Sequence, residues 1–220
     1  MADMRVNAVL SGAIAAMSVA ASLLPTAVAT AASCPDVEVI FARGRSEPPG
    51  IGRIGDAFVD ALRADTPKSI GVYAVNYIAD WDIVPGANDM SRHIQYMAAN
   101  CPNTRLVPGG YSLGAAVVDV VLSATQSQFG FNSPLPPGID NHIAAVALFG
   151  NGTHSIFGPV SAANNPIYGP KTIDQCNGDD PICNGIDPNT LVGNWSQHLQ
   201  DAYIDSGLVS QAADFVTERL

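Results

Sequence analysis

The feature that most constrains this chain is a regular alternation of short apolar segments with segments of helical periodicity. Residues rich in β-branched and other apolar types predict five strands, at 36–44, 70–79, 104–112, 142–151 and 171–176. Apolar residues at helical spacing predict helices at 51–66, 86–100, 113–125 and 208–220. Strands separated by helices pair in parallel and carry helices on both faces of their sheet. We therefore expect a three-layer α/β/α sandwich around a central, mostly parallel five-stranded sheet.

The length of the chain and its apolar content fit one globular domain preceded by a leader. The chain has 220 residues, of which 47% are hydrophobic. The run AVLSGAIAAMSVAASLL (8–24) and the small residues after it are typical of a secretory signal peptide. We expect a signal peptide at 1–31 and a folded domain at 32–220. A start at Met4 and a retained membrane anchor are the alternatives, because Asp3 offsets Arg5, the one basic residue before the run.

Cysteine usage and net charge restrict the compartment and the partners. Four cysteines all follow the expected cleavage site, which predicts two disulfides and an oxidising compartment; they are Cys34, Cys101, Cys176 and Cys183. No CxxC pair occurs and the four histidines are scattered, so we expect no metal site. A net charge of −10 argues against nucleic acid or an anionic membrane as a partner.

Ser112 lies in GGYSLGAAV (109–117), where a predicted strand ends and a predicted helix begins. A serine hydroxyl becomes a nucleophile only when a base removes its proton, and G-x-S-x-G at such a turn exposes the hydroxyl to one. Gly110 and Gly114 fit this geometry, because the tight turn leaves no room for a Cβ. The pattern favours Ser112 as a nucleophile over a simple polar residue at a helix start.

A serine nucleophile requires a histidine base, which in this arrangement follows the serine in the chain with an acid between them. His142 precedes a predicted strand and is expected at the amino edge of the sheet, opposite Ser112. His154 follows the same strand and is expected at the correct edge. His198 lies in NWSQHLQDAY, where a loop can bring it over the serine. His154 and His198 are therefore both candidates.

The candidate acid lies in CNGDDPIC (176–183), just after the last predicted strand. A loop bracketed by two cysteines would hold a carboxylate at the carboxyl edge of the sheet, and both Asp179 and Asp180 are available. The short loop gives a disulfide little chain entropy to remove, so local rigidity is its expected use. The alternative is a solvated acidic turn with no catalytic role.

These motifs together resemble the cutinase family, in particular its mycobacterial-type, cutinase-like branch. The resemblance covers the whole mature chain and rests on FARGRSEPPG, GGYSLGAAV, CNGDDPIC and QHLQDAY, which occur in this order between positions 41 and 203. It implies a fold of the α/β-hydrolase type and a secreted serine carboxylic ester hydrolase, free in the medium or associated with the cell wall. No cofactor is expected.

The resemblance also assigns the roles that the residues alone left open. The family's nucleophile falls on Ser112. Its acid lies three residues before the second cysteine of the bracketed loop, which is Asp180 and not Asp179. Its histidine, followed closely by an aromatic residue, falls on His198, and the order serine, aspartate, histidine disfavours His154.

The same resemblance implies two disulfides, which pair Cys34 with Cys101 and Cys176 with Cys183. It further implies an oxyanion hole made by the backbone N–H groups of Arg45 and Leu113. Many family members have glutamine where this chain has Leu113, which leaves the backbone donor unchanged. They have serine or threonine where this chain has Arg45, so we expect no hydroxyl donor from that position.

Substrate selection is expected to depend on two apolar loops near the carboxyl edge, YIADWDIVPG and GIDPNTLVGNW. We predict that their apolar side chains wall an acyl groove, with ordinary loop packing as the alternative; they are Ile78, Trp81, Ile83, Val84, Leu191, Val192 and Trp195. No long amphipathic insertion suggests a lid, so esters of short to medium acyl chains are favoured.

The function expected from the sequence is therefore ester or lipid hydrolysis by a monomer that has no stable protein partner. Two other functions use the same scaffold. One is acyl transfer to an alcohol through the same triad, and the other is a catalytically inactive secreted cell-envelope or binding protein.

Overall fold

The computed structural model describes Met1 and residues 34–153, 162–185 and 192–220. The chain divides into Met1–Ser33 and a compact unit, Cys34–Leu220. Apart from Met1, the expected signal peptide lies outside the described residues. Within the described ranges, no helix is long and apolar enough to cross a membrane.

A five-stranded sheet in the order β2-β1-β3-β4-β5 forms the centre of the compact unit, and every strand pair in it is parallel. The strands are β1 Val37–Ala42, β2 Ile70–Ala74, β3 Arg105–Tyr111, β4 Val146–Phe149 and β5 Thr172–Gln175. The expected architecture is confirmed, and a sheet expected to be mostly parallel is parallel throughout.

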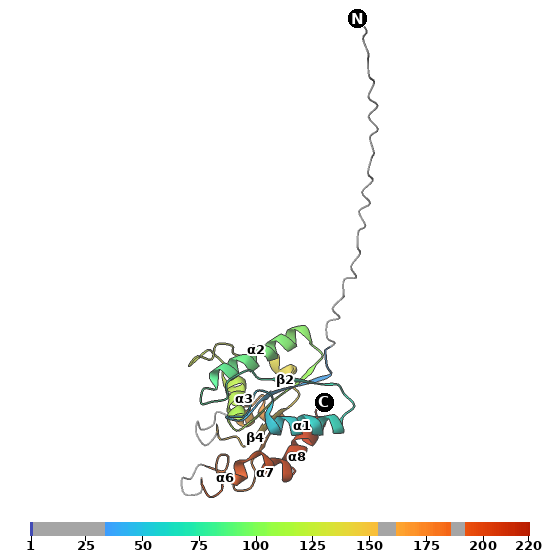
Figure 1. Ribbon diagram of the computed structural model, residues 1–220. Helices are drawn as coiled ribbons and strands as arrows, with labels where there is room; N and C mark the ends of the chain where they lie inside the picture. The colour runs from blue at the N-terminus through green and yellow to red at the C-terminus, as the bar shows by residue number, and fades with distance from the viewer. Residues whose placement is uncertain (2–33, 154–161, 186–191) are drawn as a thin grey trace. The chain divides into compact units, whose positions relative to one another are not determined.

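Helices cover both faces of this sheet (Figure 1), and each face has its own apolar core. The long helices are α1 Gly52–Asp65, α2 Val84–Asn100, α3 Leu113–Ser123 and α8 Leu208–Thr217. Val39 and Phe41 of β1 pack into the core under α1 and α8, whereas Ile40 and Ala42 pack into the core under α2 and α3. Alternate residues of a strand point to opposite faces, so β1, which is buried on both faces, is apolar at every position except Glu38.

The remaining elements are short and lie mainly in the second half of the chain. They are the 3-10 turns η1 Ile139–Asn141, η2 Ala162–Asn164 and η3 Gly169–Lys171, and the helices α6 Trp195–His198 and α7 Gln200–Asp205. Helix α2 begins earlier than the apolar spacing indicated, because Pro85 occupies a first-turn position where its missing N–H costs nothing.

Pro108 occupies a central strand because the pairing of β3 with β4 is interrupted beside it. Leu106 and Ser112 donate their N–H groups toward the β4 side, to the carbonyls of His142 and Phe149. Every second residue of a strand directs its N–H to the same side, so the nitrogen of Pro108, which carries no hydrogen, also faces β4. Pairing there consists of one isolated bridge at Leu106 and a ladder that resumes at Gly109. The strand therefore loses no ladder hydrogen bond at the proline.

Candidate active site

The site lies at the carboxyl edge of the sheet, where three neighbouring strands end in step. Tyr111 pairs with Phe149, and Phe149 pairs with Gln175. The residues that follow these positions are therefore brought together across the edge, as is usual for reactive groups in parallel sheets. Ser112 follows β3, and the loop that holds Asp180 follows β5.

Ser112 joins β3 to α3 in a strained backbone conformation. Its φ is 54° and its ψ is −117°, a combination that residues with a Cβ rarely adopt. Its N–H donates to the Phe149 carbonyl at 2.8 Å, and its own carbonyl accepts from the Ala115 N–H at 3.0 Å. These contacts hold the serine at the apex of a sharp strand-to-helix turn, which directs its side chain away from the sheet.

The two glycines of the motif are there because the turn brings backbone against backbone. A Cβ on Gly114 would lie 1.9 Å from the Ala42 carbonyl oxygen, and one on Gly110 would lie 2.3 Å from the Gly114 carbonyl oxygen. Both contacts are with the main chain, which cannot rotate away as a side chain can. Helix α3 consequently begins directly against the end of β1.

His198, the last residue of α6, lies over the serine. Its Nε2 is 2.8 Å from Ser112 Oγ, and the ring is almost fully buried, with 3% of the residue exposed. Tyr111 stacks beside the imidazole, with ring centroids 5.4 Å apart, and its hydroxyl donates to the His198 carbonyl. Tyr111, the residue before Ser112, thus holds both the ring and the backbone of the histidine.

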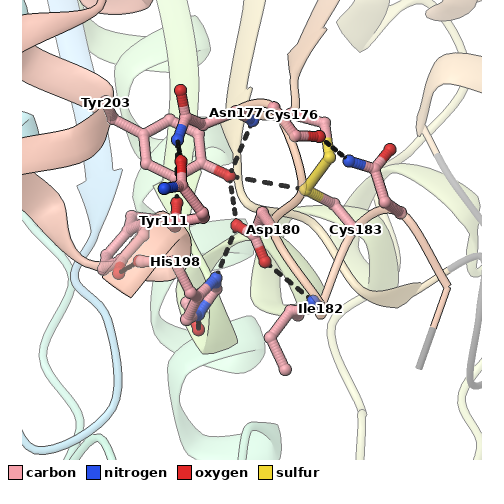
Figure 2. Close-up of polar contacts among 12 residues, drawn as sticks. Tyr111, Cys176, Asn177, Asp180, Ile182, Cys183, His198 and Tyr203 are labelled. Carbon is pink, nitrogen blue, oxygen red and sulfur yellow. Dashed lines mark hydrogen bonds and ion pairs between the residues drawn. A yellow bond between two sulfur atoms is a disulfide. The ribbon is translucent and has the colours of Figure 1, made fainter. Parts of the chain in front are cut away.

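Asp180 completes a hydrogen-bonded chain with the serine and the histidine. Its Oδ2 lies 2.7 Å from His198 Nδ1, and its Oδ1 accepts the Ile182 N–H at 2.7 Å. Figure 2 shows the loop that carries it, closed by the disulfide between Cys176 and Cys183. The side chain is completely buried, whereas the neighbouring Asp179 is exposed.

The charge of Asp180 is maintained despite this burial. Burial raises the pKa of the carboxyl. The hydrogen bonds from His198, Tyr203 and the Ile182 N–H lower it by more than burial raises it, so the pKa lies below the usual aspartate value. Asp180 is therefore an anion at neutral pH. An anion in this position favours the His198 tautomer that carries its proton on Nδ1, which leaves Nε2 as an acceptor facing the serine.

Tyr203 on α7 is a contact that the sequence did not predict. Its hydroxyl donates to Asp180 Oδ2 at 2.5 Å and accepts the Asn177 N–H at 3.2 Å, and its ring is completely buried. The only signal in the sequence was the aromatic residue that closes QHLQDAY, which helped to identify His198 but was given no role of its own.

The predicted oxyanion loop follows β1 and is held from several sides. Arg43 is buried and donates to the carbonyls of Glu47 and Tyr77, while the Glu47 carboxylate accepts the N–H groups of Gly44 and Arg53. A Cβ on Gly44 would lie 2.6 Å from the Tyr111 ring, so glycine lets this loop lie beside β3, the strand that ends just before Ser112. The clamping role of Glu47 was likewise not predicted.

The two predicted oxyanion donors differ in origin but share one property. The Arg45 N–H lies within the clamped loop, and the Leu113 N–H is the first in α3, where a helix provides no internal acceptor. Across the ranges that the structure describes, neither N–H donates to a protein acceptor.

The residues predicted to wall an acyl groove are in different environments. Ile78, Trp81 and Val192 are exposed, at 82%, 79% and 86%, and the Arg45 guanidinium stacks 4.7 Å from the Trp81 ring centroid. Trp195 is partly exposed and lies 5.1 Å from His198 between ring centroids. In contrast, Ile83 packs against the core under α2 and α3, and Val84 is the first residue of α2. Leu191 lies outside the described residues.

The other candidate residues lie elsewhere or outside the described ranges. His142 caps η1, and its backbone carbonyl accepts the Leu106 N–H near the start of β3, which places His142 at the amino edge of the sheet. His154 lies outside the described residues. The disulfide between Cys34 and Cys101 joins the segment before β1 to the end of α2. Among the described residues, no group of three or more His, Cys, Asp or Glu side chains could hold a metal ion.

The sequence and the fold are both similar to those of known proteins. The cutinase family model matches residues 33–220. A probable carboxylesterase of Mycobacterium tuberculosis, Culp2, is 60% identical over 219 residues, which cover 95% of this chain and 94% of the relative. The phospholipase Culp4 of the same species is 51% identical over 218 residues, covering 96% and 92%. The structure of a Trichoderma reesei cutinase in complex with a C11Y4 phosphonate inhibitor aligns with a TM-score of 0.63 and 31% identity, covering 84% of this chain and 76% of that one.

Proposed function

This chain belongs to the cutinase family of ester-hydrolysing enzymes, and we propose that it cleaves carboxylic esters through an acyl-enzyme formed on Ser112. The observation that carries the proposal is the unbroken hydrogen-bonded chain from Ser112 Oγ through His198 to Asp180, with links of 2.8 and 2.7 Å. An assembled chain of this kind favours an active hydrolase over an inactive protein on the same scaffold.

The proposed reaction has two halves that use the same three side chains. Ser112 Oγ attacks the ester carbonyl carbon while His198 Nε2 takes the hydroxyl proton, and Asp180 stabilises the imidazolium that forms. The tetrahedral intermediate then expels the alcohol, which receives that proton from His198. Water attacks the acyl-enzyme by the same route, and the carboxylic acid is released. Every proton that His198 accepts is returned, so the cycle requires no cofactor.

Negative charge on the carbonyl oxygen requires donors that are already in place. We propose the N–H groups of Arg45 and Leu113 for this role. The support is that neither donates to a protein acceptor among the described residues, that Glu47 clamps the loop of Arg45, and that Gly114 allows α3 to begin against the end of β1.

The proposed substrates are esters with short to medium acyl chains. The support is two exposed aromatic side chains beside the site: Trp195 lies 5.1 Å from His198 between ring centroids, and Trp81 stacks with the Arg45 guanidinium. The relatives are named as carboxylesterase and phospholipase, so both simple esters and phospholipids belong in the substrate panel. The absence of a lid remains a prediction, because 154–161 and 186–191 lie outside the described residues.

Export and a monomeric state belong to the same proposal. A signal peptide at 1–31 and a mature domain at 32–220, secreted or associated with the cell wall, fit the two disulfides, which are typical of oxidising compartments. Amino-terminal sequencing of the exported protein tests the cleavage site. Light scattering after size-exclusion chromatography tests the monomer.

Turnover of p-nitrophenyl esters from acetate to palmitate by the mature protein and by Ser112→Ala tests the function. We expect hydrolysis that declines for long chains, and none above background in the variant. An alkylphosphonate p-nitrophenyl ester should release one p-nitrophenolate per wild-type molecule and leave the mass of its phosphonyl group, without the p-nitrophenolate, on Ser112. Turnover by Ser112→Ala within about tenfold of wild type would contradict the proposal, because losing a triad nucleophile costs several orders of magnitude.

A further inference from the structure

We propose that Tyr203 is a positioning residue of this enzyme, which holds the Asp180 carboxylate in place and sets how strongly that carboxylate retains a proton on His198. The inference rests on the proposed serine mechanism and extends it by a fourth side chain. Tyr203 comes from α7, an element that contributes no other group to the hydrogen-bonded chain.

Three donors from the described part of the chain hold the Asp180 carboxylate, which is inaccessible to solvent. Oδ1 accepts the Ile182 N–H, and Oδ2 accepts both His198 Nδ1–H and the Tyr203 hydroxyl (Figure 2). The histidine and the tyrosine therefore share one oxygen atom. A donor that shares the oxygen withdraws charge from it, so the tyrosine weakens the hold of the carboxylate on the imidazole proton while fixing its rotation.

The tyrosine ring is itself rigidly placed. It packs edge-on against Tyr111 of β3 and Phe149 of β4, with centroid distances of 5.9 and 6.5 Å. Gly150, just after β4, has a φ of 58°, and a Cβ there would lie 3.0 Å from both the Tyr203 hydroxyl and His198 Cε1. Glycine adopts this conformation without strain and leaves room for the tyrosine and the histidine beside the aspartate.

The same hydroxyl links Asp180 to the disulfide-closed loop. It accepts the Asn177 N–H at 3.2 Å and lies 3.4 Å from Cys183 Sγ. The Asn177 side chain in turn donates to the Gln197 carbonyl at 3.1 Å, one residue before His198. Loop, tyrosine and histidine thus form one connected network, in which the hydroxyl of Tyr203 uses its hydrogen as donor and its oxygen as acceptor.

The ionisation of these groups agrees with the geometry. Burial and the neighbouring Asp180 carboxylate raise the pKa of Tyr203 well above its usual range, so the phenol keeps its proton and remains a donor. Burial raises the pKa of Tyr111 in the same way, and this phenol also stays neutral. The other charged groups of the adjoining elements include Arg43 and Glu47 on the oxyanion loop and the exposed Asp179. They also include Asp174 on β5, which accepts from Asn151, Asp205 at the end of α7, and Arg53, which pairs with Asp201 on the surface.

Tyr203→Phe removes the hydroxyl and keeps the packed ring, so it isolates the hydrogen bond. We expect kcat to fall about tenfold with little change in KM, since a charge-assisted bond is lost away from the substrate. We also expect the acidic limb of the kcat/KM profile to move to higher pH by about half a unit to one unit, because the unshared carboxylate retains the imidazole proton more strongly.

Tyr73→Phe is the matched control, because it also removes a tyrosine hydroxyl that donates to an aspartate. That bond runs to Asp89 Oδ2 at 3.0 Å, and the Tyr73 ring stacks on His93, neither of which belongs to the site. We expect wild-type kcat and an unmoved pH profile. A profile that moves equally in both variants, or in neither, would overturn the proposal.

A second replacement keeps the proposal testable if Tyr203→Phe fails to fold. 3-Fluorotyrosine in place of Tyr203 is nearly isosteric and has a more acidic phenol, so it should move the acidic limb to lower pH. A limb that stays in place or moves up would overturn the proposal. Thermal unfolding between pH 3 and pH 6 gives a readout independent of catalysis: the loss of stability on acidification should be smaller in Tyr203→Phe than in wild type. If wild type is inactive on every ester, the serine mechanism fails, and this readout still decides the bond to Asp180.

Discussion

His198 Nδ1 and Asp180 Oδ2 lie 2.7 Å apart in a buried contact, although the two residues are 18 positions apart in the chain. The contact links the end of α6 to the disulfide-closed loop after β5. Because it sets the tautomer of the histidine, it is the link on which the proposed chemistry most depends.

Asp180→Asn should preserve the fold and lower kcat by about a thousandfold to ten-thousandfold. The asparagine amide can donate to Nδ1, which places the imidazole proton on Nε2. Nε2 then faces Ser112 as a donor and cannot accept the hydroxyl proton. Ester turnover checks the loss of kcat, and near-ultraviolet circular dichroism of the same preparation checks that the fold is preserved. A variant that retains a tenth of wild-type kcat would reopen the choice of acid.

Acid stability should depend on the same carboxylate. The pKa of Asp180 is lowered in the folded protein, so its stabilising contribution is complete above the unfolded aspartate value, about 3.9, and is lost as pH falls through the folded value. Urea unfolding of wild type and Asp180→Asn from pH 6 to pH 2.5 should show that the free energy of unfolding falls more steeply in wild type over the acidic part of the range. Parallel curves would count against a lowered pKa.

Ser112→Ala and Ser112→Gly should both be inactive but should differ in stability. Alanine retains the Cβ at φ 54°, whereas glycine adopts this conformation without strain. Allowing for the greater freedom of glycine in the unfolded chain, we expect Ser112→Gly to be more stable by about 1 kcal/mol. Thermal unfolding of the two variants side by side tests this, and a less stable glycine variant would show that the turn is unstrained.

The two disulfides should have different uses. They close loops with sequence separations of 7 and 67, for which chain entropy predicts contributions of about 2 and about 4 kcal/mol. Replacing Cys176 and Cys183 by serine should therefore lower ester turnover far more than melting temperature, since the loop carries Asp180. Replacing Cys34 and Cys101 should lower melting temperature first. Initial rates measured well below each melting point separate these effects, and equal losses of rate would make the acidic loop a surface staple only.

Gly114→Ala should be strongly destabilising, by more than about 4 kcal/mol, because its Cβ would meet the Ala42 carbonyl oxygen at 1.9 Å. Gly207→Ala is the control. Gly207 has a φ of 80° and open space around it, so alanine there incurs only the left-handed backbone cost, about 1–2 kcal/mol. Chemical denaturation of both variants tests the prediction, and equal losses would show that the close approach of α3 to β1 relaxes easily.

Local pattern was sufficient to predict the layers of the fold, since strand and helix periodicities are properties of neighbouring residues. All five strands and the four long helices lie where the pattern indicated, although β2 ends at Ala74, several residues early. The strand stops because Val75 and Tyr77 turn into the core under α2 instead of continuing along the edge of the sheet. A one-dimensional pattern records that these residues are apolar but not which neighbour they will cover.

The serine turn and the aspartate loop were identifiable because their glycines and cysteines lie close to them in the sequence and indicate a tight turn and a short closed loop. Choosing between Asp179 and Asp180, and between His154 and His198, required the family resemblance, because adjacent or similarly ordered side chains have the same local signature. The structure buries Asp180 against His198 and leaves Asp179 in solvent.

What the sequence by itself determined is the order of elements, the strained turn at Ser112 and the set of residues that could react. Only the tertiary structure decided that Tyr203 donates to Asp180, that Tyr111 holds the His198 carbonyl and that Glu47 clamps the oxyanion loop. The first two of these contacts join residues 23 and 87 positions apart, and Glu47 also meets Gln200 across 153 positions. Such contacts depend on sheet register and on how α7 packs against β3 and β4, and these follow from the whole buried surface rather than from any local run of residues.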